Sequence, residues 1–256
     1  MLSGIDHIVI VVADLRTAIE NYTDLGFTVT PGGKHPIGSE NALIPFADDS
    51  YIELIAFTIS NSGLLWQEQL RNGGGIVDFC VRCNDLSEQR ELFRKAGIAM
   101  DEPRPLSRQR PDGYVLNWML VTPQLPWAGI VPFLIEDITP REERVPSNRQ
   151  HTNGARGIAS ITLAVSDAKT LSVFYETIVG ENSEPANFPE INAAGFRLKL
   201  GPQTCLLLSP TSNAGPIAEW LQTRGPSPYA AALTTLSHKP GTLDRAKCEN
   251  ARLALV

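Results

Sequence analysis

The sequence lacks the short motifs on which several common chemistries depend. No G-x-G-x-x-G follows the first apolar strand, and no phosphate-binding loop, G-x-S-x-G elbow or H-E-x-x-H is present. The chain also has no run of Lys or Arg, and its 28 acidic and 22 basic residues give a net charge of -6. We therefore expect neither nucleic acid nor an anionic membrane as a partner.

Cysteine is scarce, and nothing points to secretion or membrane insertion. Of four cysteines, Cys80 and Cys83 form a C-x-x-C with no second pair, and two residues three apart in a strand point to opposite faces. We interpret them as small strand side chains. No basic segment precedes the first apolar stretch, and the longest mostly apolar stretch, 119–135, contains three prolines. These features predict a soluble cytoplasmic protein.

What the chain does contain is an internal repeat. A β-branched strand at 4–12 leads through Asp14, a fitting helix N-cap, into a helix with apolar residues at helical spacing. Strands at 27–30, 42–46 and 51–55 follow, with a Gly-rich loop after the first of them. The order is βαβββ.

The same order returns three times. Positions 4–15 align without gaps with 75–86, which places Asp14 on Asp85. In the second copy, further strands are predicted at 97–98, 114–121 and 130–135. In the third copy, strands are predicted at 157–165, 196–200 and 204–208. A shortened fourth copy has predicted strands at 229–235 and 252–256 and a helix at 243–248. Short helices at 63–70 and 216–221 precede the second and fourth copies.

This longer repeat divides the chain into two halves. Residues 1–137 hold the first two copies, and residues 157–256 hold the third and the shortened fourth. The segment 138–156 between them is polar and contains two prolines and six charged residues, so it is predicted to be a linker.

Paired βαβββ modules resemble the vicinal oxygen chelate superfamily, which includes glyoxalase I, extradiol dioxygenases and bleomycin and fosfomycin resistance proteins. In sequence, Asp6-His7-Ile8-Val9 and the segments 32–35, 41–46 and 51–54 look like the bacterial glyoxalase-like domain family. The resemblance implies an α+β fold whose tandem modules form two half-barrel domains. It also implies a divalent metal held by the first and last strands of each module.

Carried over residue by residue, the resemblance places His7 and Glu53 at the two ligand positions of the first module. The gapless alignment puts Asp78 on His7. Glu136 reaches the position of Glu53 only with a shifted register, and strict alignment places Phe133 or Leu134 there. Imidazole and carboxylate suit Zn, Mn, Ni or Fe, and the resemblance does not choose among them. In the second half, Ser160 and Leu206 stand at these positions and cannot complete such a site.

Other polar and aromatic residues are candidates for the same pocket. Glu53 and His35, which follows two glycines, are candidate catalytic groups. Asn41, Arg110 and Trp118 are candidate substrate contacts, since an arginine can pair with a carboxylate or phosphate and a tryptophan offers a large apolar surface.

Two hypotheses about function remain open. The first is a divalent-metal-dependent lyase or isomerase that acts on a small oxygenated molecule, in which the metal stabilises an enolate-like intermediate. The second is a protein that binds or sequesters a small molecule without turnover, as the drug-resistance members do. A ring-cleaving dioxygenase is disfavoured, because those enzymes hold their metal in the C-terminal half. A monomer or homodimer is expected.

Overall fold

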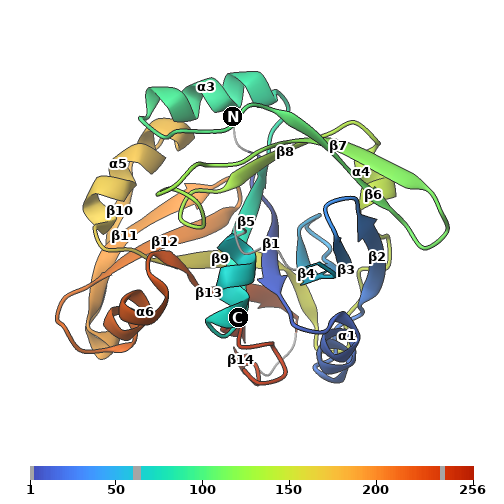
Figure 1. The fold of residues 1–256 in the computed structure, drawn as a ribbon. Coiled ribbons are helices and arrows are strands. Elements are labelled where there is room, and N and C mark those ends of the chain that lie inside the picture. The colour runs from blue at the N-terminus through green and yellow to red at the C-terminus, as the bar shows by residue number, and fades with distance from the viewer. Residues whose placement is uncertain (1–2, 60–64, 237–239) are drawn as a thin grey trace.

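The chain forms two β-sheets, one in each half (Figure 1). The computed structural model describes residues 3–59, 65–236 and 240–256. In the first half, eight strands close into a barrel in the order β1-β4-β3-β2-β6-β7-β8-β5. These strands are β1 (Ile5–Val11), β2 (Thr30–His35), β3 (Ser39–Pro45), β4 (Tyr51–Phe57), β5 (Gly75–Arg82), β6 (Arg104–Gln109), β7 (Val115–Val121) and β8 (Phe133–Asp137).

The second half forms an open sheet of seven strands in the order β10-β11-β12-β9-β13-β15-β14. Its elements are β9 (Ala155–Ala164), α5 (Ala168–Val179), β10 (Glu184–Phe188), a 3-10 turn (Pro189–Ile191), β11 (Ala193–Leu200), β12 (Gln203–Pro210), α6 (Pro216–Arg224), β13 (Ser227–Thr235), β14 (Gly241–Thr242) and β15 (Leu253–Leu255). The predicted α+β fold of tandem βαβββ modules is confirmed.

Helices of the modules begin in the same way. The carboxylates of Asp14, Asp85 and Asp167 each accept a hydrogen bond from the backbone N–H three residues later, at 2.7–2.9 Å. They start α1 (Leu15–Asp24), α3 (Leu86–Lys95) and α5. In Figure 1, α3 and α5 lie side by side, one from each half.

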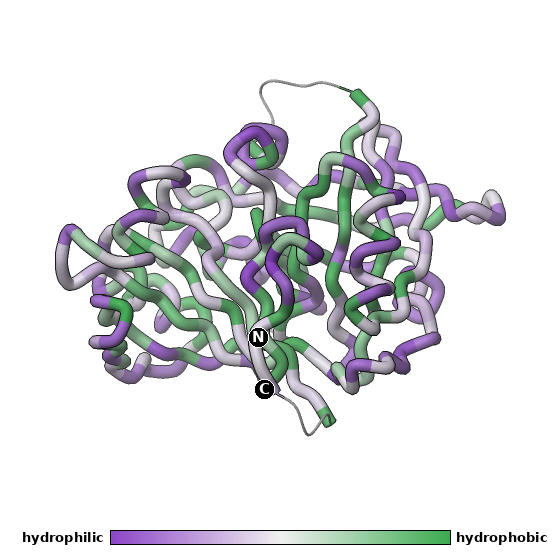
Figure 2. The backbone as a smooth tube through the Cα atoms, turned by 90° about the horizontal axis from the view of Figure 1, so that it is seen from below, coloured by the Kyte–Doolittle hydropathy of each residue, from purple (hydrophilic) through white to green (hydrophobic). Residues whose placement is uncertain are grey.

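A shared core joins the halves. The even-numbered β1 side chains Ile8 and Ile10 pack on the outer face of the barrel, in one buried cluster with Leu163 and Leu207 of the second sheet. The helix tyrosines also cross over: Tyr22 of α1 donates to the carbonyl of Cys248, and Tyr175 of α5 donates to that of Ile130. Figure 2 shows hydrophobic residues concentrated along the interior strands and hydrophilic ones on outlying turns. Among the described residues, no helix has the length and apolar character to cross a membrane.

The Gly-rich stretch after 27–30 is part of a strand, which corrects the predicted loop. Residues 27–29 are irregular, and β2 runs through Gly32 and Gly33 to His35. At Gly33, φ is +137°, and a Cβ would overlap the carbonyl oxygen of Gln109 on β6. This close approach lets β2 pair with β6 at Lys34 and Gln109, and so closes the barrel.

Three other predicted elements differ. The strand predicted at 97–98 is absent, and Arg104–Gln109 supplies it instead, although its sequence is polar and contains a proline. The helix predicted at 243–248 is a set of hydrogen-bonded turns at 245–250. The helix predicted at 63–70 corresponds to α2 (Leu65–Arg71), and positions 63 and 64 lie outside the described residues.

Barrel closure gives a first prediction. Gly33→Ala should lower the free energy of unfolding by about 2 kcal/mol or more, because it adds a clash with backbone to an unfavourable φ. Gly113 has φ +87° but nothing within 4 Å of a Cβ, so Gly113→Ala is a control for the backbone strain alone. Urea unfolding measures both. Equal losses in the two variants would contradict the close approach.

Candidate functional site

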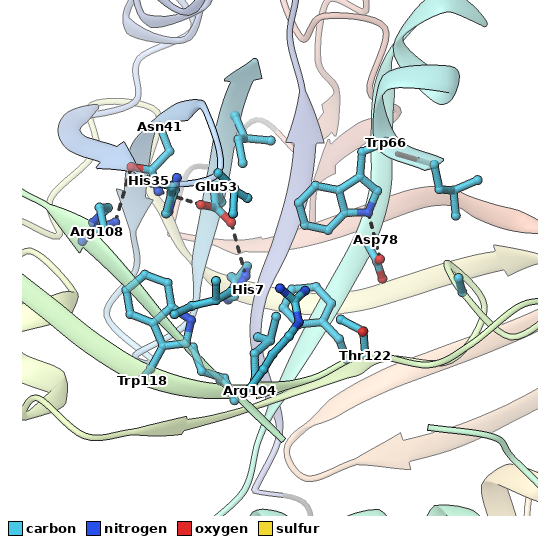
Figure 3. A pocket seen from close by; sticks show the side chains of 18 of the residues that line it. His7, His35, Asn41, Glu53, Trp66, Asp78, Arg104, Arg108, Trp118 and Thr122 are labelled. Atoms are coloured by element: carbon cyan, nitrogen blue, oxygen red, sulfur yellow. Dashed lines mark hydrogen bonds and ion pairs between the residues drawn. The ribbon is translucent and has the colours of Figure 1, made fainter. Parts of the chain in front are cut away.

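The barrel encloses a cavity of about 290 Å³ to which all eight strands and α2 contribute (Figure 3). Its walls are largely apolar, with the aromatic rings of Trp66, Trp118 and Phe133 among them. The polar residues gather at separate places. Figure 3 shows His35, Asn41 and Glu53 on one side and the pair of Trp66 and Asp78 on the other, with His7 between.

A β-bulge positions His7. Ile5 pairs with Val81 and His7 pairs with Cys80, so Asp6 is an extra residue in β1. Asp6 thereby reaches the side chain of its own neighbour, and its Oδ1 lies 2.7 Å from His7 Nδ1. The other ring nitrogen, Nε2, lies 3.5 Å from Glu53 Oε2. The Tyr51 ring stacks on the imidazole at 4.5 Å.

Arginines from the segment after β8 neutralise Asp6. Both Arg141 and Arg144, which bound the short helix α4 (Arg141–Arg144), form ion pairs with the fully buried Asp6 carboxylate. Arg144 also pairs with Asp137 and donates to the Tyr51 hydroxyl at 2.7 Å. Burial is the largest single effect and opposes ionisation of Asp6, but the charges of Arg144 and Arg141 and the hydrogen bond and charge of His7 together outweigh it, so the pKa lies well below its usual range.

Glu53 is an ionised carboxylate inside the cavity. Burial raises its pKa, but the hydrogen bond and charge of His7 and the 2.6 Å hydrogen bond from Asn41 Nδ2 prevail and lower the pKa to about 2. The pKa of His7 is raised in turn: burial opposes protonation, and hydrogen bonds to Asp6 and Glu53 favour it more. Without another cation, the pair is an imidazolium and a carboxylate.

Across the cavity, Asp78 titrates near neutrality. Burial raises its pKa to about 7, against the lowering effect of a 3.0 Å hydrogen bond from Trp66 Nε1 and a 2.9 Å hydrogen bond from the Phe79 N–H. A carboxyl group with this pKa can accept or donate a proton at physiological pH.

The two modules of the barrel are related by symmetry, but their chemistry is not. Strand pairing places Asp78 at the counterpart of His7 and Phe133 at the counterpart of Glu53. A second bulge, at Val77, is the counterpart of the bulge at Asp6. In the second half these positions hold only Ser160, Leu206, Ala230 and Ala254.

The remaining predicted residues separate into two groups. His35, Asn41 and Trp118 line the cavity. The ring of His35 lies edge-on to Trp118 at 6.0 Å, and burial lowers its pKa. Arg110 does not line this cavity, and pairs with Asp112 and Glu143 on the surface.

The side chain of Glu136 also points away from the cavity. Phe133 and Ile135 of β8 face the cavity, whereas the alternate residue Glu136 accepts a hydrogen bond from the Leu86 N–H at the start of α3, at 3.2 Å. The structure therefore places Glu136 apart from His7 and Glu53.

Several residues of the site escaped the sequence reasoning. Arg104 and Arg108 alternate with Leu106 along the inner face of β6, and Arg108 is 4% exposed. Their period-two spacing is the available signal, but it is informative only once 104–109 is recognised as a strand. Arg144 lay in the predicted linker, and no local pattern connects it with Asp6.

His7 and Glu53 are two residues of the cavity that could hold a divalent cation between them. The ionised Asp6 can only accept, so His7 Nδ1 carries a proton, and Nε2 faces a second acceptor in Glu53. A proton or a metal ion must lie between these two atoms. The oriented His with a buried carboxylate behind it is typical of metal sites.

Among the described residues, the three donor groups closest to one another are those of Asp6, His7 and Cys80. This trio suits a cation poorly, because Asp6 already binds two arginines. Burial also raises the pKa of the Cys80 thiol well above its usual range, so the thiol carries its proton.

Comparison with known proteins places this architecture. The chain superposes on a hypothetical protein from Staphylococcus aureus with a TM-score of 0.70, 11% identity and 98% of each chain covered. It also superposes on a mutant of 4-hydroxymandelate synthase from Streptomyces coelicolor, with a TM-score of 0.66 and 16% identity, covering 91% of this chain and 71% of that one. The fold is that of the vicinal oxygen chelate proteins.

The family follows from the sequence. The family model described as "Glyoxalase-like domain" matches residues 5–179, about two thirds of the chain, and the protein belongs to this family. A fusion of a xylose isomerase-like TIM barrel and 4-hydroxyphenylpyruvate dioxygenase is a more distant structural match, with a TM-score of 0.55 and 16% identity, covering 93% of this chain and 37% of that one. No curated protein matches the sequence significantly.

The buried charge network gives a second prediction. Asp6→Asn should destabilise the fold by about 3–5 kcal/mol, because it leaves Arg144 and Arg141 short of a buried partner. Chemical denaturation measures the loss, and Asp112→Asn, which breaks an exposed ion pair, is the control with little change expected.

The same variant has a consequence for acid stability. The folded-state pKa of Asp6 is depressed, so its contribution is present above the unfolded value of about 3.9 and is lost as the pH falls through the folded value. Asp6→Asn should therefore lose part of the stability difference between pH 5 and pH 2. An unchanged difference would argue against an ionised Asp6.

A third prediction concerns Asp78. Trp66→Phe keeps an aromatic wall but removes the N–H that stabilises the carboxylate, so the Asp78 pKa should rise above about 7. Trp118→Phe, on another part of the wall, should leave the pKa unchanged. Carbon-13 NMR titration of the Asp78 carboxyl measures both. A fall in the Trp66→Phe variant would contradict this account.

Proposed function

We propose that the chain is a metal-dependent lyase or isomerase whose barrel cavity binds a small, oxygenated, largely apolar substrate. The observation that carries this proposal is the placement of His7 Nε2 3.5 Å from Glu53 Oε2 inside an apolar cavity, with the other imidazole nitrogen fixed by Asp6. His7 and Glu53 would hold a Zn, Mn, Ni or Fe ion. When bound, the ion would supply Lewis acidity, which stabilises negative charge on a substrate oxygen.

The side chains of the cavity support this chemistry. Asp78 lies across from Glu53 and has a pKa of about 7, so it is suited to move a proton at a carbon or oxygen of the substrate. His35 is neutral at pH 7 because burial lowers its pKa, and it can donate or accept a hydrogen bond beside Glu53. Trp66, Trp118 and Phe133 line the cavity with apolar rings, which would help to keep water from the reacting groups once a substrate is bound.

One observation favours a second candidate, a protein that binds a small molecule without turnover. Phe133 occupies the counterpart of Glu53, and Asp78 is engaged with Trp66, so a full set of four ligand side chains is not assembled. A ring-cleaving dioxygenase with its metal in the C-terminal half is not supported, since Ser160, Leu206, Ala230 and Ala254 provide no imidazole or carboxylate.

Metal analysis gives a fourth prediction and separates the candidates. The purified protein, reconstituted with each metal in turn, should retain about one ion per chain. His7→Ala and Glu53→Gln should each lose most of it. Glu136→Gln is a matched control, because that carboxylate faces α3 and the metal should stay. Elemental analysis and titration calorimetry measure content and affinity.

The outcomes decide between the two proposals. Full retention of metal in both cavity variants would refute the assignment to His7 and Glu53. Loss in Glu136→Gln alone would place the ion elsewhere. If the native protein takes up none of the four metals, the binding-protein candidate is favoured.

A further inference from the structure

Arg108 is a buried cation that forms no ion pair with a carboxylate of the described residues. Its side chain is 4% exposed, and it donates to the carbonyl oxygen of Arg144 at 2.9 Å and to Asn41 Oδ1 at 3.5 Å, both uncharged acceptors. Its buried Nε has no hydrogen-bond partner within the described part of the chain. Arg144 is buried to the same degree but has both Asp6 and Asp137.

A guanidinium in this state is destabilised relative to its exposed state, because it has lost its hydration, unless an anion approaches it. Among the described residues, Glu53 is the carboxylate whose charge acts on Arg108, but the Asn41 amide stands between them, accepting from Arg108 and donating to Glu53. Glu53 also has His7 as its own cation. Arg108 can therefore still form an ion pair with an anion that enters the cavity.

Arg104 repeats the pattern on the same face of β6. It lines the cavity four residues from Arg108, is exposed, and forms no ion pair with the described residues. Four residues of a strand span about 13 Å. Among the described residues, the cavity therefore has one arginine without an ion pair in its interior and a second one at a solvent-exposed position, where positive charge draws anions inward.

We propose that the substrate of this cavity carries a carboxylate, which pairs with the Arg108 guanidinium while the rest of the molecule packs on Trp118 and its apolar neighbours. Arginine is suited to this role because its planar fork binds the two oxygens of a carboxylate together. The mostly apolar lining favours an aromatic or branched aliphatic body over a sugar or a polyphosphate. The inference rests on the proposed function for the cavity being the active site, and it names the class of substrate.

The test compares an acid with its uncharged counterpart. Phenylacetate should bind the native protein at least about tenfold more tightly than phenylacetamide. Arg108→Gln should remove this preference by weakening phenylacetate binding and leaving that of the amide within about twofold. Arg110→Gln removes a half-buried arginine that does not line the cavity, two residues away, and should change neither affinity. Calorimetry, with benzoate and 4-methylpentanoate and their amides as further pairs, gives the affinities.

Metal content measured on the same samples separates this inference from the proposed function. Acid preference without bound metal would retain the carboxylate site and reject the metal-dependent enzyme. Loss of metal in Arg108→Gln would show that Arg108 acts by positioning Glu53 through Asn41, and would overturn the inference. Equal affinity for acid and amide, or no binding of any pair by the native protein, would also overturn it, and neither result requires a variant to fold.

Discussion

The buried carboxylate of Asp6 is the constraint on which the rest of the site depends. A charge with no solvent contact must be matched, and here three groups match it: His7 beside Asp6, and Arg141 and Arg144 from the segment between the sheets. The same contact that neutralises Asp6 therefore fastens that segment to the barrel and fixes the tautomer of His7. Orientation of the imidazole and attachment of this segment to the barrel therefore have one physical origin.

The charge of Asp6 also explains why only the first of the two modules carries a histidine–carboxylate site. The two bulges lie at symmetric positions, so the backbone has the same local geometry before His7 and before Asp78. At the second bulge Val77 replaces Asp6, and no buried charge is present to recruit arginines or to orient a neighbour. Asp78 then lacks a cation of its own and has a pKa near 7, and Phe133 fills the place of Glu53 with an apolar ring.

The repeat, and with it most of the fold, could be predicted from the sequence, because β-branched strands and aspartate caps are local signals. His7, Glu53 and Asp78 stood out for a related reason, as polar residues inside apolar strands. The strand Arg104–Gln109 could not be recognised, since its proline and alternating polar residues are typical of a loop, and only pairing with β2 and β7 makes it a strand. Without that strand, the inward-facing Arg108 carries no local signal, whereas Arg110 stands at a turn that resembles the family pattern.

Contacts between residues far apart in the sequence could not be predicted from local patterns. Arg144 lies 138 positions from Asp6, in a segment whose composition resembles a solvated linker. The lack of an ion pair at Arg108 cannot be predicted from its neighbours in the sequence either, because the acceptors around it come from distant segments. An uncharged amide, Asn41, separates Arg108 from Glu53, so the cavity keeps a cation and an anion apart that would otherwise neutralise each other. A site that holds unlike charges apart in an apolar enclosure can engage two different ends of one ligand, and this separation suits the cavity to a largely apolar molecule with polar ends, bound in one orientation.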